Sequence, residues 1–528
     1  MFIDRFFRKH PGIIAGSLIV SVVFLYVGYM YLHVFGSSCC LITRDSRLYL
    51  GLASGDKSWT EMLGTVVPLG YPIYLMAHKL IFGSYSWVAI VQLLMYEFSV
   101  LLFFIALLRA GFSAFGAVAS VLPLVFTDDL FGYIAPEALS SPFVLISLSM
   151  VIFIKFDSSR FSTIVRRGMW LVLVVAVAVI YHGRPSSLPY LIIIPFFAVF
   201  LEFFSGWNLG LRIQWKPLVG VFFRYLSATF LPYLGYCVFR LIIVGHFGLV
   251  SYGGSTAIGV TAPLLKAETI PLLSAELRPL AGAMLQAKAD NRAILNALPG
   301  AREFDDEEMK KYGNIMEAAY ETYGMIKRHT LGRVIWEDLS PDATVFGFPI
   351  HNYYKMVAHY DDYRVLVGWK PAVVLFGGDR TEINKIFTRL ASELIVLYPV
   401  EYARWVISGL AASWSRMCRR VTFDGYLMLL FLPLAMVNFI AAESGGMKPA
   451  CRVLNREVGF TLVLAAAVFV PLSLLLALVT MPLDRYVDVT ATFVPTFVAL
   501  LMWRMVCQAW CFFRNGYDNG MISLPRSP

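Results

Sequence analysis

The chain has 528 residues, of which 58% are hydrophobic and only 15% are charged. This composition excludes an ordinary soluble enzyme, and the length suits about ten membrane spans of about 20 residues each, plus one domain outside the membrane. The formal net charge is +9. The basic residues cluster in short loops and at the termini, which indicates a membrane topology and no nucleic-acid partner.

The first predicted span follows a basic N-terminus, which contains Arg5, Arg8 and Lys9. The positive-inside rule places this terminus in the cytoplasm. The apolar segment is too long for a cleavable signal peptide and lacks a small-residue cleavage motif, so we expect it to remain as an anchor. Residues 36–85 are only moderately apolar. They are predicted to form an external loop with one or two helices that lie along the membrane interface.

Further spans follow in two groups, one in the first half of the chain and one near its end. Basic clusters such as Arg166-Arg167 and polar loops such as Asp128-Asp129 fall on alternate sides, as a consistent topology requires. Both termini are therefore expected in the cytoplasm, and the lack of Asn-X-Ser/Thr sequences favours a bacterial membrane weakly. The predicted spans are 12–34, 86–108, 112–127, 138–155, 168–182, 188–205, 217–244, 425–442, 457–480 and 489–511.

The character of the chain changes between the two groups of spans. Residues 246–385 contain shorter hydrophobic runs and more Pro and Gly, which predicts an extracytoplasmic domain, mixed α/β or mainly helical. Phe304–His329 opens with acidic side chains and is predicted to be a soluble helix. Two later segments, Ala343–Phe348 and Val365–Leu375, could be short strands, although periodicity alone does not decide this. Residues 386–424 are predicted to be interfacial helices broken at Pro399.

The predicted fold class is therefore an all-α polytopic membrane protein with one small domain outside the membrane. Its N-terminal membrane module covers residues 1–245 and its C-terminal membrane module covers residues 425–528. The extracytoplasmic domain and the interfacial helices lie between these modules. No repeat with a period of 20 to 50 residues is present, and the two modules do not pair as inverted repeats.

The predicted topology brings charged residues from several separate loops to one face of the membrane. A carboxylate at such a face can accept a proton from an attacking hydroxyl, and arginine or lysine can hold a phosphate. This combination suits group transfer from a lipid phosphate carrier. The residues are Arg44, Asp45, Arg47, Lys79, Asp128, Asp129, Glu137, His182, Arg184 and Arg485.

Each of these residues also has a structural interpretation. Asp45 can pair with a neighbouring arginine, and Glu137 suits the first turn of a helix because it follows Pro136. The paired aspartates at 128 and 129 are more often a solvated turn, and the arginines at 184 and 485 can anchor the chain at head groups. Within the spans, burying Glu97 or Arg224 costs free energy unless the group is paired, so a structural role is favoured for both, and the two could pair with each other.

The order and sidedness of these motifs resemble the GT-C superfamily of integral membrane glycosyltransferases. The closest resemblance is to the bacterial branch that uses polyprenyl-phosphate-linked single sugars. Asp45, in Arg44-Asp45-Ser46-Arg47-Leu48-Tyr49, occupies the place of the acidic residue in that family's first external loop. The resemblance covers the membrane part but not residues 246–385. Its other motifs are Leu69-Gly70-Tyr71-Pro72, Ala135-Pro136-Glu137-Ala138-Leu139, Tyr398-Pro399-Val400-Glu401-Tyr402 and Asp484-Arg485-Tyr486.

The resemblance implies an inverting transfer in which Asp45 is the general base and a phosphate leaves without a general acid. The resemblance implies no cofactor. Some relatives hold a divalent metal, and here Asp45, Asp128 and Glu137 could hold one, although a site without metal is favoured. The implied phosphate-binding residues are Arg184, Arg485 and Lys79. The implied acceptor-binding or supporting residues are Arg44, Tyr49, Asp128, Glu137, His182 and Tyr486.

The implied partners are a polyprenyl-phosphate sugar, a glycan, lipid or protein acceptor in the cell envelope, and membrane lipids. The implied location is the bacterial inner membrane, with the active site facing the periplasm. Two other functions stay open from the sequence. A transporter or flippase of lipid-linked sugars would need charged groups along a path through the bilayer. A ligase would move a whole glycan from a pyrophosphate carrier.

Overall fold

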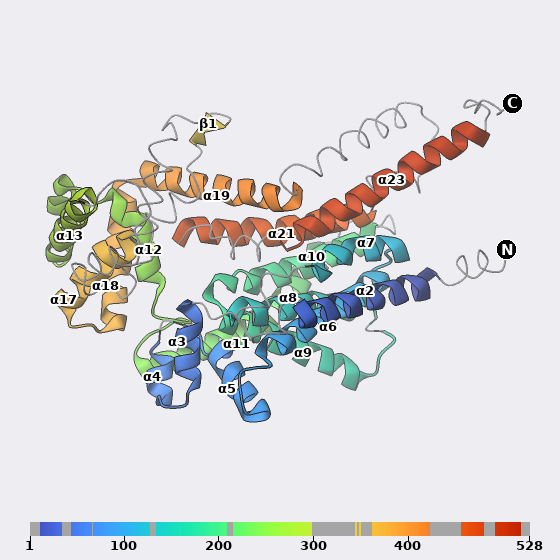
Figure 1. Ribbon diagram of the computed structural model, residues 1–528, viewed down its shortest axis with the longest axis horizontal. Helices are drawn as coiled ribbons and strands as arrows, with labels where there is room; N and C mark the ends of the chain where they lie inside the picture. Colours follow the sequence, from blue (N-terminus) through green and yellow to red (C-terminus); the bar gives the residue numbers. More distant parts are fainter. Residues whose placement is uncertain are drawn as a thin grey trace.

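The computed structural model describes residues 11–33, 44–65, 67–126, 134–157, 159–207, 215–297, 344–345, 348–349, 362–422, 456–479 and 492–518. In these residues the chain is almost entirely helical (Figure 1). The helices of the first half are α2 (Pro11–His33), α3 (Arg44–Ala53), α4 (Trp59–Leu63), α5 (Gly70–Phe82), α6 (Val88–Arg109), α7 (Ala114–Val125), α8 (Pro136–Phe156), α9 (Thr163–Gly183), η1 (Pro185–Ser187), α10 (Tyr190–Trp207) and α11 (Trp215–Val244).

The second half adds short helices, one strand pair and three long helices. They are α12 (Gly253–Thr261), η2 (Ala262–Leu264), η3 (Ala267–Leu272), α13 (Arg278–Ala297), β1 (Thr344–Val345), β2 (Phe348–Pro349), the π-helical η4 (Asp362–Trp369), α17 (Lys370–Phe376), α18 (Arg380–Leu397), α19 (Pro399–Thr422), α21 (Arg456–Val479) and α23 (Val494–Asp518). The two strands pair antiparallel, with Thr344 opposite Pro349.

Seven described helices are long and apolar enough to cross a membrane, which makes the chain a multi-pass membrane protein. They confirm seven of the predicted spans. The predicted span at 112–127 corresponds to the shorter apolar helix α7, and that at 489–511 to the apolar part of α23, Val494–Trp510; 425–442 lies outside the described residues. The seven are Ile14–Leu32, Val88–Arg109, Pro136–Phe156, Thr163–Gly183, Pro185–Ser205, Trp215–Val244 and Arg456–Val479.

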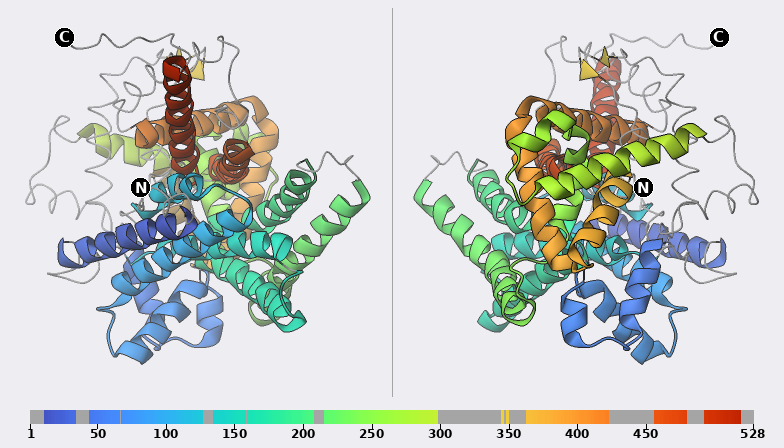
Figure 2. Two further views of the ribbon diagram at one scale, coloured as in Figure 1. Left: turned by 90° about the vertical axis from the view of Figure 1, so that its right-hand side faces the viewer. Right: turned by 90° about the vertical axis from the view of Figure 1, so that its left-hand side faces the viewer.

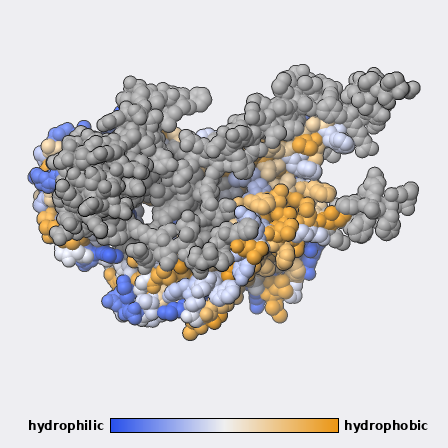
Figure 3. All heavy atoms as spheres, viewed as in Figure 1, coloured by the Kyte–Doolittle hydropathy of each residue, from blue (hydrophilic) through white to orange (hydrophobic). Residues whose placement is uncertain are grey.

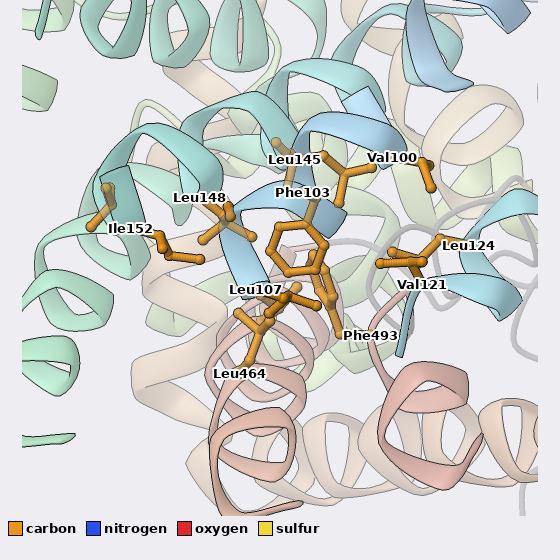
Figure 4. Close-up of a cluster of buried hydrophobic side chains, with 14 of the residues drawn as sticks. Val100, Phe103, Leu107, Val121, Leu124, Leu145, Leu148, Ile152, Leu464 and Phe493 are labelled. Carbon is orange, nitrogen blue, oxygen red and sulfur yellow. The ribbon is translucent and has the colours of Figure 1, made fainter. Parts of the chain in front are cut away.

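A single apolar core holds most of these helices together. Figure 4 shows Phe103 and Leu107 of α6 between side chains of α7, α8 and α21. Close packing, and not removal from water, stabilises such side chains in a membrane bundle, because the surrounding lipid is as apolar as they are. The helix α11 is the least enclosed, and Figure 2 shows it leaning away from the bundle beside α10. Figure 3 shows a large hydrophobic area at α2 and a smaller one at α5.

The helices alternate in direction as the basic loops predicted. At one end of the bundle, here named the α3 end, α3, α4 and α5 meet the start of α8 and the last turns of α9 and α11. At the opposite end, Asp157 pairs with Arg109 at 3.4 Å, which joins the last turns of α6 and α8. Lys155 pairs with Glu202 there, and Arg504 pairs with Glu457.

The domain after α11 is helical in its described part and has a core of its own. Side chains from α12, α13, α17 and α18 form this core, and Ile383, Phe387 and Leu394 are fully buried in it. The helix α18 crosses the predicted boundary at 385, and its side chains pack in this core. The predicted strand at Val365–Leu375 is wrong, since η4 and α17 occupy it. The predicted helix at Phe304–His329 lies outside the described residues.

The chain bends sharply where Pro399 was predicted to break it. The axes of α18 and α19 differ by 103°. Beyond the bend, α19 runs antiparallel along α21: the Tyr402 hydroxyl donates to the Leu478 carbonyl at 2.7 Å, and the rings of Trp414 and Phe469 lie 6.0 Å apart. Figure 1 shows the two helices side by side. The helix α19 therefore packs alongside a spanning helix, and its predicted place at the membrane interface stays a prediction.

Candidate functional site

The predicted external loop folds onto the α3 end of the bundle. Ser46 in the first turn of α3 donates from its hydroxyl to the Ile134 carbonyl at 2.7 Å, just before α8 begins. The first residue of α5, Gly70, lies so close to α9 that a Cβ there would be 2.7 Å from the His182 carbonyl oxygen. Only glycine permits this approach. The loop is therefore fixed to the ends of two spanning helices.

The short helix α4 is closed by a capping box in this loop. The Glu61 carboxylate accepts from the Ser58 backbone N–H and from its hydroxyl, both at 2.8 Å. These hydrogen bonds favour the charged form and lower the pKa of Glu61. Its negative charge also suits the first turn of the helix. Glu61 thus has a structural role at this end.

The sequence Gly183-Arg184-Pro185 explains how an arginine reaches the site. A residue before proline is restricted from helical geometry, and Arg184 is extended (φ −152°, ψ 134°), so α9 ends at Gly183. A Cβ on Gly183 would lie 2.2 Å from the Ser140 hydroxyl oxygen of α8. The glycine lets α9 and α8 touch, and the turn that follows directs Arg184 across the start of α8.

The guanidinium of Arg184 forms an ion pair with the Glu137 carboxylate. The Glu137 side chain is 2% exposed and that of Arg184 is 13% exposed. Glu137 also occupies the first turn of α8, directly after Pro136, where the helix dipole favours a negative charge. The sequence predicted Arg184 as a ligand of the donor phosphate and Glu137 as an acceptor-binding or supporting residue. The structure shows the two side chains paired with each other.

The backbone of Asp45 lies at the same end of the bundle as this pair. Ser46, its neighbour, bonds to Ile134, and Glu137 follows Ile134 within one helical turn. The side chains of Arg44, Asp45 and Arg47 lie outside the described part of the structure. The first turn of α3 and the first turn of α8 nevertheless share one end of the bundle, as the sequence predicted.

Aromatic rings from the loop form a continuous series next to the ion pair. Tyr49 of α3 meets Tyr71 of α5 edge to face at 5.2 Å, and Tyr71 stacks with Tyr74 at 5.8 Å. His78 continues the series with its ring 6.1 Å from Tyr74 and 4.5 Å from Phe82. Burial raises the pKa of Tyr71 and lowers the pKa of His78, so both are neutral near pH 7.

The structure places the remaining predicted site residues in different surroundings. His182 is half-buried at the same end, with its ring 4.3 Å from that of Tyr236. Lys79 is exposed and lies about 13 Å along α5 from Gly70, at about 1.5 Å per residue. Its ammonium group lies 5.9 Å from the centre of the Tyr85 ring. Lys79 therefore contacts the loop after α5 and not the ion pair of Arg184 and Glu137. Three predicted residues lie outside the described part: Asp128, Arg485 and Tyr486.

Sequence reasoning missed Arg240, a fully buried arginine at the α3 end. Its guanidinium donates to the Leu63 carbonyl at 2.9 Å, to the Gly248 carbonyl at 3.0 Å and to the Ser251 hydroxyl at 2.8 Å. It therefore ties α11 to α4 and to the loop that leads into the domain. An arginine within an apolar run between Phe239 and Leu241 was the signal that could have revealed it.

The predicted ion pair between Glu97 and Arg224 is wrong. Arg224 is exposed on α11, whereas Glu97 is buried in α6 and neither of its carboxyl oxygens has a hydrogen-bond partner in the described residues. No described group of three or more His, Cys, Asp or Glu side chains could hold a metal ion. The metal set predicted from Asp45, Asp128 and Glu137 stays a prediction, because the side chains of Asp45 and Asp128 lie outside the described residues.

The α3 end therefore offers an arginine in an ion pair, neutral aromatic hydroxyls and the first turn of α3, where Asp45 lies. Such an arrangement can bind an anion and orient hydroxyl groups. Comparison with known proteins adds no identity: no family model, no curated protein and no solved structure matches the chain.

Proposed function

We propose that this chain is an integral membrane glycosyltransferase, which moves a single sugar from a polyprenyl-phosphate donor to a hydroxyl of a cell-envelope glycan, lipid or protein. Its active centre is at the α3 end, with Asp45 as the general base. The observation that carries the proposal is the 2.7 Å hydrogen bond from Ser46 to the Ile134 carbonyl. It supports an active centre in which the first turn of α3 faces the ion pair of Glu137 and Arg184.

In the proposed reaction, the Asp45 carboxylate takes the proton of the acceptor hydroxyl as its oxygen attacks the anomeric carbon of the sugar. The bond from that carbon to the phosphate oxygen breaks at the same time, and the polyprenyl phosphate leaves with the electron pair. Attack from the opposite side inverts the anomeric centre. Arg184 stabilises the charge on the departing phosphate, and Glu137 holds the guanidinium in position.

Access for a prenyl chain is supported by the outward face of α5. Ile73 is 44% exposed, Leu80 is 87% exposed and Ile81 is 72% exposed. These side chains follow one another at helical spacing on a helix at the α3 end, beside the exposed Trp87 at the start of α6. An apolar face next to spanning helices suits contact with acyl or prenyl chains at the membrane interface.

The proposed location is the bacterial inner membrane, with the α3 end outside and both termini in the cytoplasm. The support is the charge of the loops at the opposite end. Arg160, Arg166 and Lys216 belong to that end, next to the clusters that join α6, α8 and α10. Basic residues in short loops are enriched on the cytoplasmic side.

The proposal is tested with purified protein, a polyprenyl-phosphate sugar and an envelope extract as the acceptor. Asp45→Asn is expected to abolish transfer while insertion and thermal stability stay unchanged. The matched control is Asp56→Asn, in the same loop, because Asp56 is exposed. Near-normal transfer by the Asp45→Asn variant would refute the assignment of the base. Use of only pyrophosphate-linked oligosaccharides would favour the glycan ligase instead.

One observation favours a second candidate, a transporter of lipid-linked sugars. Glu97 is buried within α6 without a hydrogen-bond partner among the described residues, and ionisable groups of this kind occur along transport paths. The two candidates are distinguished in sealed vesicles. A transporter would move the lipid-linked sugar across the vesicle membrane without forming a new glycosidic bond, whereas the enzyme forms product in detergent.

A further inference from the structure

A carboxyl group lies deep within the membrane-spanning part of α6. Glu97 is 2% exposed, and both of its carboxyl oxygens are buried without a hydrogen-bond partner in the described part of the chain. It lies about 13 Å along the helix from Val88, at about 1.5 Å per residue, which is near the middle of a hydrocarbon core about 30 Å thick. Burial of an ionisable group in this position costs free energy, so a functional role is the first explanation to test.

No described cation neutralises Glu97. Helices α2, α7 and α8 pack along α6, and side chains of α5 and α21 also reach it. Of the described acids and bases on these helices, Lys155 pairs with Glu202, Glu137 with Arg184 and Glu457 with Arg504, all at helix ends. Lys79 lies over the Tyr85 ring, His78 lies against Phe82 and Arg456 lies over the Phe204 ring. An unpaired carboxylate in such surroundings carries the full free-energy cost of burying a charge, whereas the neutral acid carries only the smaller cost of an unmade hydrogen bond. The neutral acid is the form that fits.

A second buried polar side chain of α6 lies nearer to the α3 end. Gln92 is fully buried about 7 Å along α6 from Glu97. Its side-chain N–H donates to the Tyr71 hydroxyl of α5 at 2.8 Å, and its own carbonyl oxygen has no partner among the described residues. The helix turns these two side chains about 140° apart, so Gln92 does not supply Glu97 with a hydrogen bond.

We propose that Glu97 is a proton-binding site within the membrane. The proton is the ligand that an unpaired, buried carboxyl can take without a counter-ion. A purely structural residue at this place would be a leucine or a methionine, which fills the same space without an unmet hydrogen bond. This site does not depend on the glycosyltransferase proposal.

The first test uses dicyclohexylcarbodiimide, an apolar reagent that enters membranes and attacks carboxylic acids. The acid proton transfers to one nitrogen of the carbodiimide, the carboxylate oxygen adds to its central carbon, and the adduct rearranges to a stable N-acylurea. The full-length protein is labelled in proteoliposomes without any sugar donor and digested for mass spectrometry. We expect the label at Glu97 and its loss in the Glu97→Gln variant.

Two carboxylates of the same protein are internal controls. Glu202 and Glu457 lie in spanning helices but are paired with Lys155 and Arg504, so they are expected to stay unlabelled. Labelling of Glu97 in the wild-type protein supports the proposal even if Glu97→Gln fails to fold. An unlabelled Glu97, or equal labelling of Glu457, would overturn it.

The second test measures proton exchange directly. A protonated carboxyl has an infrared C=O band that shifts when the protein is moved into D₂O. We expect a band that shifts in D₂O in the wild-type protein and is absent in Glu97→Gln. The control is Ser99→Ala, which should keep the band, because the Ser99 hydroxyl donates to the Tyr96 carbonyl at 2.6 Å and does not bind Glu97. A wild-type protein without this band, or a band that persists in Glu97→Gln, would overturn the assignment.

Discussion

Substitution of Gly183 by alanine tests how closely α9 must approach α8 to hold the site. The added Cβ would lie 2.2 Å from the Ser140 hydroxyl oxygen, far inside van der Waals contact. Ser140 can turn away only if it gives up its 3.0 Å hydrogen bond to the Pro136 carbonyl. Overpacking of this kind costs about 1–3 kcal/mol, and we expect the free energy of unfolding in mixed detergent micelles to fall by about that amount.

The partner substitution Ser140→Ala is expected to relieve the clash. Without the hydroxyl, the nearest Ser140 atom to the new methyl group is the Cβ at 3.5 Å, an ordinary contact. The double variant should therefore be more stable than Gly183→Ala alone, with a coupling energy of about 1–2 kcal/mol. Gly168→Ala is the control in the same helix, because a Cβ there meets nothing within 4 Å. Equal stability of the two glycine variants, or no relief in the double variant, would refute this reasoning.

Three further predictions concern buried groups. Glu457→Gln leaves Arg504 buried without its carboxylate and should lower the free energy of unfolding by about 3–5 kcal/mol, measured in the same micelles. Arg240→Met removes three hydrogen bonds and should cost at least about 2 kcal/mol, with Arg240→Lys restoring only part of it. Burial lowers the pKa of His78 below 6.5, so the unfolded chain binds this proton more readily. Stability is therefore expected to fall as the pH drops below about 6.5, and less so in His78→Phe.

The spans could be predicted from the sequence because a membrane imposes one simple requirement. About 20 apolar residues must follow one another, and the basic loops must alternate. The shorter helices show the limit of this signal. The helix α7 was predicted as a span, yet its apolar part is only Ala114–Val125, and the segment α19 was missed as a companion of α21 because Glu401 and Arg404 interrupt its apolar face.

The side-chain partners could not be predicted because they depend on which helices touch. Glu97 and Arg224 were the obvious pair by composition, but α11 leans outward and leaves Arg224 exposed. The Glu137 and Arg184 pair joins the start of α8 to the end of α9, two positions that hydropathy cannot bring together. Val365–Leu375 has a strand-like run of β-branched residues, and packing in the helical domain overrode that preference.

The two ends of the bundle use charge differently, and this difference favours the α3 end as the site. At the opposite end, Glu457 accepts from the Ser113 N–H at 2.7 Å and pairs with Arg504, while Arg456 stacks on Phe204 at 4.1 Å and donates to Ala110. These charges close helix ends, which is a structural role. At the α3 end, Glu137 in the first turn of α8 pairs with Arg184, and the first turn of α3, which contains Asp45, lies at the same end of the bundle. Arginine suits an anionic lipid phosphate, which is why we place the proposed donor site at this end.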